Sequence, residues 1–188
     1  AGHRAVSSAW FDEDVTVADL EIPAFSAAAA PPNGARRVEL AGVRDPGSQP
    51  LTPPTPRTDD PLELVWQAIT TGIRDYVNKN GFPSVILGLS GGIDSALCAS
   101  LAADALGPER VFGVGMPSAH SSEHSLEDAQ ALADNLGITY RVESITQLVA
   151  GFDNQLGLTG LAAENVQARA RGVVLMALSN QEGHLVLT

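Results

Sequence analysis

The amino-acid sequence predicts an α/β fold, a parallel sheet with helices on both faces. Short apolar runs such as Val85-Ile86-Leu87 alternate with segments of ten or more residues that carry apolar side chains at helical spacing. This alternation is typical of parallel sheets, whose strands are joined through helices. The polar, glycine-containing motifs of the chain follow the apolar runs directly. The carboxyl ends of parallel strands should therefore bring these motifs to one crevice.

The first 61 residues are expected to lie outside this sheet. Residues 1–25 place Val15, Val17, Leu20 and Ile22 among acidic residues, which suggests one or two strands with polar faces. Residues 26–61 are rich in Ala, Pro and Gly and are predicted to be a linker or an extended surface crossing. The predicted segments are therefore 1–25, 26–61 and 62–188.

The pattern becomes regular from Leu62 onward. Apolar residues fall on one helical face up to Val77, and Gly81 and Pro83 end that helix. Beyond it we expect strands at 85–89, 111–116, 139–143 and 184–188, and helices at 94–106, 123–136, 144–152 and about 163–180.

Residues 88–95, Gly-Leu-Ser-Gly-Gly-Ile-Asp-Ser, join the first of these strands to the next helix. Such a strand–turn–helix unit directs backbone N–H groups and a helix N-terminus at one point, which favours phosphate. The two adjacent glycines leave room for a phosphate oxygen, while Ser90 and Ser95 add hydroxyl donors. Asp94 would repel phosphate unless a cation such as Mg²⁺ lies between them. The lysine of a Walker A motif is absent from the loop.

Ser90-Gly91-Gly92-Ile93-Asp94-Ser95 resembles the pyrophosphate loop of the N-type ATP pyrophosphatases, which split ATP into AMP and pyrophosphate. Met116-Pro117-Ser118 with the serines after it, and the segment Glu164–Arg171, resemble NAD synthetases of the glutamine-dependent bacterial type. The likeness covers about residues 62–188. More faintly, the first 25 residues resemble the end of a nitrilase-like glutaminase domain. The resemblance implies an adenine nucleotide alpha hydrolase-like fold, with a Rossmann-like three-layer arrangement.

The activity that the resemblance implies is ATP-dependent amidation of nicotinic acid adenine dinucleotide (deamido-NAD) to NAD. The nicotinate carboxylate attacks the α-phosphate of ATP, and ammonia, free or from glutamine, then displaces AMP. The family also implies Mg²⁺ and a homo-oligomer. In the family, a Thr-Gly-Asn-Lys-Ser-Glu loop that helps to bind metal and substrate follows the strand at 184–188. We therefore expect residues 62–188 to be an incomplete synthetase domain, inactive alone.

The resemblance also assigns roles to particular residues. Asp94 and Ser95 are the expected catalytic residues, and Asp94 is also the expected Mg²⁺ ligand. Three residues, Asn165, Arg169 and Arg171, are expected to contact deamido-NAD. The expected ATP-binding residues are Gly88, Leu89, Ser90, Gly91, Gly92, Ile93, Asp94, Ser95 and Met116.

Structural roles remain open for several of these residues. Arg169 and Arg171 are two positions apart and cannot share one direction on a helix, so either is also suited to an ion pair or to solvent. A helix cap is the alternative role for Asn165. The sole cysteine, Cys98, is expected to be a packed core thiol. Turn and cap hydrogen bonds are the expected role of at least two of Ser118, Ser121 and Ser122.

The composition limits the choice of partners. A formal net charge of −11 argues against nucleic acid as the main partner, because binding its backbone needs clustered Lys and Arg. This charge and the Glu164–Arg171 segment count against another pyrophosphate-loop ligase, GMP-synthetase-like or tRNA-thiolating. A non-catalytic ATP-binding module is the remaining alternative. No run of about 18 apolar residues and no signal-peptide pattern occurs, so we predict a cytoplasmic protein with no membrane partner.

Overall fold

The computed structural model describes residues 6–19, 51, 60–119 and 121–188. The chain divides into two compact units, Ala1–Asp60 and Pro61–Thr188, each of which is described by itself. Whether residues 1–25 and 26–61 belong to a glutaminase remnant and a linker stays a prediction.

No strand forms within residues 6–19 of the first unit, so the strand predicted around Val15 and Val17 is wrong. Both side chains are exposed, at 89% and 66%, because no second apolar layer covers them there. A local turn forms instead, in which the Asp14 carboxylate accepts hydrogen bonds from the Ala9 N–H and the Thr16 hydroxyl. Leu20, Ile22 and the predicted linker, apart from Leu51, Asp60 and Pro61, lie outside the described residues.

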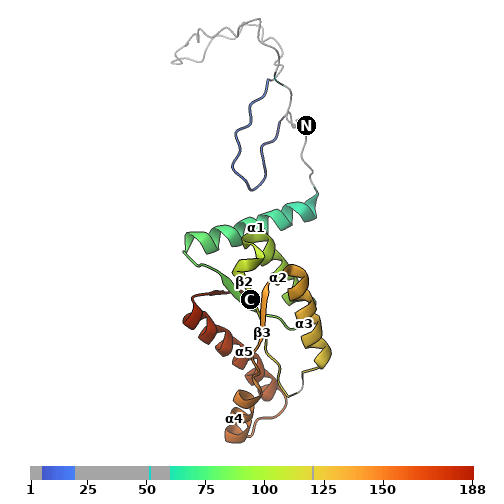
Figure 1. Ribbon diagram of the computed structural model, residues 1–188, viewed down its shortest axis with the longest axis vertical. Helices are drawn as coiled ribbons and strands as arrows, with labels where there is room; N and C mark the ends of the chain where they lie inside the picture. The colour runs from blue at the N-terminus through green and yellow to red at the C-terminus, as the bar shows by residue number, and fades with distance from the viewer. Residues whose placement is uncertain (1–5, 20–50, 52–59, 120) are drawn as a thin grey trace, which may run out of the picture. The chain divides into compact units, whose positions relative to one another are not determined.

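In the second unit, strands and helices alternate in the predicted order (Figure 1). The strands are β1 (Val85–Gly88), β2 (Val111–Gly115), β3 (Thr139–Val142) and β4 (Leu185–Val186). The helices are α1 (Pro61–Lys79), α2 (Ile93–Leu106), α3 (Glu123–Leu136), α4 (Thr146–Leu156) and α5 (Leu161–Glu182), with a short 3-10 helix at Pro108–Arg110.

The four strands form one parallel sheet in the order β3-β2-β1-β4. In its register, Val85 of β1 lies between Val111 of β2 and Leu185 of β4. The predicted fold class is confirmed. Among the residues that the structure describes, β4 is paired with β1, and it is shorter than the predicted strand at 184–188.

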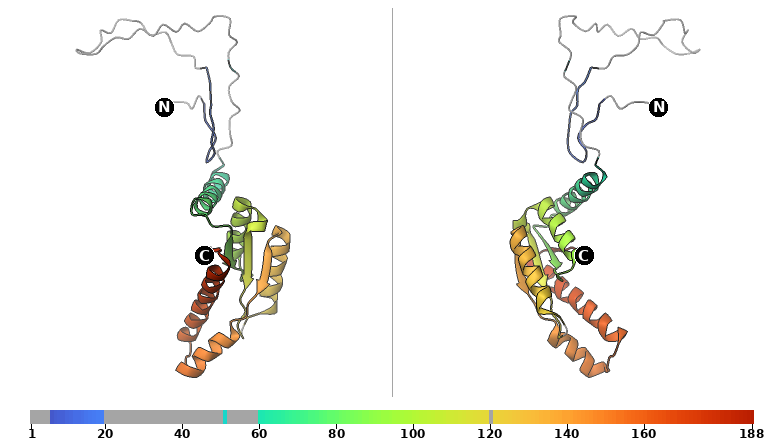
Figure 2. Two further views of the ribbon diagram at one scale, coloured as in Figure 1. Left: turned by 60° about the vertical axis from the view of Figure 1, so that its left-hand side comes forward. Right: turned by 90° about the vertical axis from the view of Figure 1, so that its right-hand side faces the viewer.

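Helices cover both faces of the sheet, as Figure 2 shows for α5 on one side and α2 and α3 on the other. The alternating side chains of β1 make this division. Val85 and Leu87 point into a core cluster with residues of α1, α2 and α3. Ile86 points into a second cluster with residues of α4 and α5. The sheet is therefore the middle layer of three.

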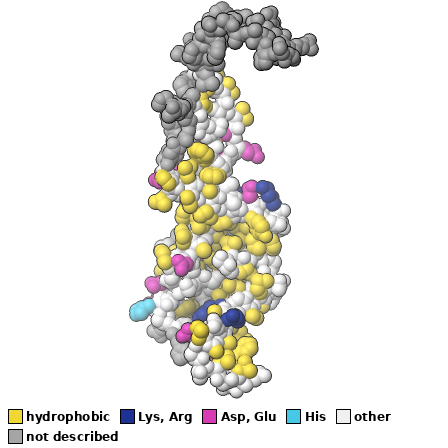
Figure 3. Space-filling view, turned by 180° about the vertical axis from the view of Figure 1, so that it is seen from behind, with side chains coloured by type: hydrophobic (Ala, Val, Ile, Leu, Met, Phe, Trp, Pro, Cys, Tyr) yellow, Lys and Arg dark blue, Asp and Glu magenta, His cyan; other side chains and the backbone are white. Residues whose placement is uncertain are grey.

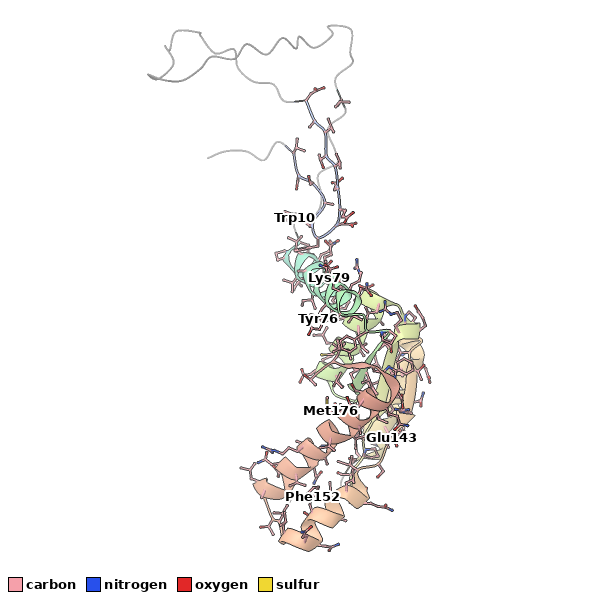
Figure 4. All side chains as sticks on the ribbon, turned by 90° about the vertical axis from the view of Figure 1, so that its left-hand side faces the viewer. Trp10, Tyr76, Lys79, Glu143, Phe152 and Met176 are labelled. Atoms are coloured by element: carbon pink, nitrogen blue, oxygen red, sulfur yellow. The ribbon has the colours of Figure 1, made fainter. Side chains whose placement is uncertain are left out.

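Several helices end at a glycine with a positive φ, a backbone conformation in which a residue with a side chain would be strained. Gly157, at φ 59°, ends α4 four residues later than predicted, and Gly183, at φ 83°, follows α5. Large apolar side chains stay exposed on these two helices, among them Phe152 and Met176 (Figure 4). Within the part of the chain that the structure describes, no helix has the length and hydropathy to cross a membrane.

Candidate functional site

A cavity of about 850 Å³ lies at the carboxyl end of the sheet. Its walls come from the loop after β1, the first turns of α2, the residues after β2, the start of α3, the middle of α5 and the residues after β4. The lining residues are Leu87, Gly88, Leu89, Ser90, Asp94, Ser95, Cys98, Met116, Pro117, Ser121, Ser122, Ser125, Leu126, Ala168, Arg171, Gly172, Leu175, Leu187 and Thr188.

Two serines hold the loop after β1 in a closed conformation. The Ser95 hydroxyl donates to the Gly92 carbonyl oxygen at 2.9 Å and accepts from the Ser90 N–H at 3.2 Å. The Ser90 hydroxyl accepts from the Gly92 N–H at 3.2 Å and lies 3.1 Å from that of Ser95. These bonds fix the loop at the N-terminus of α2, whose first N–H groups have no acceptor within the helix. These first N–H groups of α2 are the donors at this end of the cavity that suit an anion.

Gly91 allows the loop to approach the start of α3. Its φ is +78°, and a Cβ atom there would lie 2.6 Å from the carbonyl oxygen of Ser125. At Gly88, a Cβ atom would lie 2.9 Å from the Met116 methyl group. A side chain at either position would displace a cavity wall.

Asp94 is exposed and lines the cavity in the first turn of α2. A carboxylate is favourable there because of the helix dipole. Among the described residues, no group of three or more His, Cys, Asp or Glu side chains could hold a metal ion. A cation at Asp94 would therefore need oxygen ligands from a bound molecule, which is how Mg²⁺ binds with phosphates.

The opposite wall is rich in serine hydroxyls. Ser122 is the N-cap of α3 and accepts from the Ser125 N–H, and Ser121 accepts from the Ser118 N–H. The expected turn and cap bonds of two serines are thus confirmed. Ser121 and Ser122 also line the cavity together with Ser125, which the sequence analysis missed. Its position three residues after a helix-capping serine is the signal that could have found it.

Arg171 and Met116 meet at the cavity. Nε of Arg171, which is partly buried on α5, donates to the Met116 carbonyl oxygen at 3.2 Å. Of the described residues that line the cavity, Arg171 is the one Lys or Arg. The Met116 side chain is 8% exposed and packs in the second core cluster. Their side chains are thus placed where the predicted contacts with nucleotide could form.

Other predicted site residues lie outside the cavity lining. Asn165 and Arg169 are exposed on α5, and Arg169 donates to the Asn165 carbonyl oxygen at 3.1 Å. The cap alternative for Asn165 is wrong, because α5 begins four residues earlier, at Leu161. In the loop, Gly91, Gly92 and Ile93 supply backbone without being among the lining residues. The roles assigned to these residues stay predictions.

Cys98 is half-buried and packs against the first core cluster, as expected of a core thiol. It also lines the cavity, one helical turn after Asp94. That second location follows from its spacing on α2, where residues four apart share a face.

Residues 65–188 match the protein-family model described as NAD synthase. The chain belongs to the NAD synthase family. The glutamine-dependent NAD(+) synthetase of Synechocystis sp. is 49% identical over 132 residues, which are 67% of this chain and 24% of that protein. The chain spans about a quarter of the length of such curated relatives.

Solved structures of NAD synthetases share the fold of this family member. The Acinetobacter baumannii glutamine-dependent NAD+ synthetase in complex with ADP is 43% identical, with a TM-score of 0.69 over 71% of this chain and 26% of that one. The NH3-dependent NAD synthetase of Campylobacter jejuni is 38% identical, with a TM-score of 0.58 over 64% and 55%. All cavity-lining residues fall within the region that matches the NAD synthase family.

Proposed function

We propose that the cavity binds ATP and that this chain serves the ATP-dependent amidation of deamido-NAD to NAD. The proposal depends on one observation above all. In a member of the NAD synthase family, Ser90, Asp94 and Ser95, from the loop after β1 and the first turn of α2, line the cavity. Membership of this family favours NAD synthesis over GMP-synthetase-like or tRNA-thiolating chemistry.

In the proposed complex, the triphosphate lies over residues 88–95, where backbone N–H groups donate to it and the Ser95 hydroxyl turns from the Gly92 carbonyl to do the same. The adenine lies near Met116, against the apolar end of β2. Hydrogen-bond donors that point at a developing charge contribute strongly to the rate enhancement of an enzyme. The loss of one such donor typically lowers the rate by about 10²–10³-fold. The loop donors would act on the charge that develops on the departing pyrophosphate.

We further propose that Asp94 holds Mg²⁺ against the phosphates. A single carboxylate that lines the cavity fits a cation whose other ligands are phosphate oxygens and water. When bound, Mg²⁺ would neutralise phosphate charge. Asp94 itself would orient the Mg²⁺-bound ATP along the first turn of α2.

The proposed reaction has two balanced steps. A carboxylate oxygen of the nicotinate attacks the α-phosphorus, the bond to the β-phosphate oxygen breaks, and pyrophosphate leaves. Ammonia then attacks the carbonyl carbon of the adenylate, loses a proton, and AMP leaves with the electron pair of the broken C–O bond. Arg171 is placed to hold an anionic group in the cavity, while Asn165 and Arg169 would contact the dinucleotide from the exposed face of α5.

We also propose that the ammonia comes from glutamine or is taken up free. The protein is proposed to be a homo-oligomer located in the cytoplasm. The exposed apolar side chains of α4 and α5, such as Phe152 and Met176, support an assembly that covers them.

Exchange of labelled pyrophosphate into ATP tests this function in a full-length synthetase that contains the sequence. We expect exchange that requires deamido-NAD, with AMP as the nucleotide product when ammonia is added. ADP formed in proportion to the amide would contradict the proposal. Exchange supported by tRNA or by a purine nucleotide acceptor, but not by deamido-NAD, would assign a different ligase. ATP binding without any exchange would indicate a non-catalytic module.

A further inference from the structure

Four polar side chains form a hydrogen-bonded chain at the end of the sheet opposite the cavity. The Ser84 hydroxyl, just before β1, lies 2.6 Å from Nδ1 of His184, just before β4. Nε2 of His184 lies 3.0 Å from a carboxylate oxygen of Glu182, at the end of α5. The other oxygen of Glu182 accepts from Arg141 of β3 at 2.8 Å. Ser84 and His184 are buried, at 7% and 6% exposure.

The chemistry of the acceptor fixes the direction of the hydrogen bonds to Glu182. The hydrogen bond from Arg141 and then that from His184 hold the pKa of Glu182 below its ordinary value, so this side chain is a carboxylate at neutral pH. A carboxylate only accepts, so Nε2 of His184 donates to it. When the imidazole carries one hydrogen, Nδ1 is then an acceptor, and the Ser84 hydroxyl donates to it.

The residue types match those of a serine hydrolase, but the geometry does not support that chemistry. Ser84 is buried and is not among the residues that line the cavity. Its hydroxyl also faces Nδ1, the nitrogen that a catalytic histidine usually turns toward its carboxylate. The chain of hydrogen bonds therefore serves the arrangement of the elements that it joins.

β4 is one of the elements that this chain of hydrogen bonds joins. Within the part of the chain that the structure describes, it has two residues and is paired with β1. Backbone hydrogen bonds at its two ends run from the Leu185 N–H to the Ser84 carbonyl and from the Leu187 N–H to the Ile86 carbonyl, both at 2.9 Å. The His184 ring adds a contact with Phe112 of β2, with ring centroids 4.3 Å apart.

The same elements form two walls of the cavity. Leu187 and Thr188 line it directly after β4, and Arg171 lines it from α5, the helix that ends at Glu182. We infer that His184 is a positioning residue for the nucleotide site: through Ser84 and Glu182 it holds β4 and the end of α5, and so places Leu187, Thr188 and Arg171. This inference rests on the proposed binding of ATP in the cavity.

His184→Phe tests the inference, because phenylalanine keeps a flat ring against Phe112 and removes both side-chain hydrogen bonds. Below the unfolding transition, we expect the affinity for Mg·ATP to fall about three- to tenfold. Amide exchange at Leu187 should rise about tenfold as β4 opens, while exchange at Leu89, which donates to Val114, stays unchanged.

Val77→Ala is the control for general loss of stability. Val77 is 1% exposed in the core beneath α1 and does not take part in the hydrogen-bonded chain. We expect this variant to unfold at a lower temperature with Mg·ATP affinity within about twofold of the parent. Equal losses of affinity in both variants would overturn the positioning role. If His184→Phe does not fold, Ser84→Ala, which removes one bond and little volume, should show the same changes to a smaller extent.

The ring nitrogens of His184 provide a readout that does not depend on ATP. When the ring carries one hydrogen, nitrogen NMR should show it on Nε2, and a single hydrogen on Nδ1 would overturn the assigned chain of bonds. Unchanged exchange at Leu187 in a folded His184→Phe variant would overturn the inference whatever its affinity for ATP. A parent protein that binds no Mg·ATP would refute the proposed function and, with it, the claim that His184 positions a nucleotide site.

Discussion

At the scale of single residues, Tyr140 carries a buried hydroxyl with no hydrogen-bond partner among the described residues. The hydroxyl fits against Gly115, where a Cβ atom would collide with it. A buried polar group without a partner lowers stability, so we expect Tyr140→Phe to raise the free energy of unfolding by about 1 kcal/mol. Chemical denaturation would measure this change.

Tyr76→Phe is the matched control, because Tyr76 is 59% exposed on α1 (Figure 4). We expect it to change stability by less than about 0.5 kcal/mol. Burial also raises the pKa of Tyr140. The parent should therefore lose stability as the pH rises above about 10, toward the raised value in the folded protein. Tyr140→Phe should lack this part of the loss, and a clear destabilisation at neutral pH would contradict the assignment.

Gly91 is the loop position where both conformation and space require glycine. Alanine there would adopt a positive φ, at a cost of about 1–2 kcal/mol, and its Cβ atom would press on Ser125. We expect Gly91→Ala to lower Mg·ATP affinity more than about tenfold, because the phosphate loop must move. Gly151→Ala is the control, since Gly151 lies within α4 with open space around it. That variant should gain about 0.5–1 kcal/mol with unchanged affinity, and equal behaviour of the two would refute this role of Gly91.

The location of the site residues was predictable where it depends on local sequence. Ser90, Asp94 and Ser95 reach the cavity because a strand, a turn and a helix follow one another within a few residues. Asn165 and Arg169 could not be placed in this way. The rotation of α5 about its axis depends on which of its side chains pack on the sheet, and several apolar positions compete for that contact.

At the scale of elements, periodicity predicted the order and type of every strand and α-helix from α1 to β4, but not the 3-10 helix at Pro108–Arg110. It failed for Val15 and Val17, because an apolar alternation becomes a strand only when a partner strand pairs with it. It also did not predict the contact between β3 and the end of α5, since Arg141 and Glu182 are 41 residues apart in the chain. Such long-range pairs depend on the packed fold.

The pair of Arg141 and Glu182 predicts a pH dependence. The pKa of Glu182 is lowered mainly by its hydrogen bond from Arg141. A lowered pKa gives stability that is fully present above the unfolded value, about 4.3, and is lost as the pH falls through the folded value. We expect Arg141→Gln to lower the unfolding temperature at pH 7, and the difference from the parent to shrink in acid. Thermal unfolding between about pH 3 and 7 would measure this.

Lys79→Gln is the comparison for that experiment. Lys79 and Asp75 form an ion pair at 2.7 Å on the surface of α1, with side chains 75% and 53% exposed. Exposed pairs contribute little, so this variant should change the unfolding temperature less than Arg141→Gln at every pH. A difference between Arg141→Gln and the parent that stays constant down to about pH 3 would show that packing, and not charge, accounts for the role of Arg141.

At the scale of the whole molecule, negative charge must be reconciled with an anionic ligand. The formal net charge is −11, and the face in Figure 3 shows few basic side chains among hydrophobic ones. Among the described residues that line the cavity, Arg171 carries a positive charge and Asp94 a negative one. ATP without a metal would therefore meet repulsion both at a distance and inside the site. A bound cation would change the effect of Asp94 from repulsion to attraction.

Asp94→Asn separates the repulsion of metal-free ATP from the attraction of a bound cation, because asparagine keeps the volume of the side chain and removes its charge. We expect the affinity for Mg·ATP to fall about tenfold or more, and the affinity for ATP in the presence of a chelator to rise. Asp128→Asn removes the same charge from an exposed site on α3 that does not line the cavity. It should change both affinities slightly and in the same direction, since only long-range repulsion is reduced. Calorimetric titration of both variants, with and without Mg²⁺, would measure these affinities. Equal responses of the two variants would mean that Asp94 acts only through its charge and holds no metal.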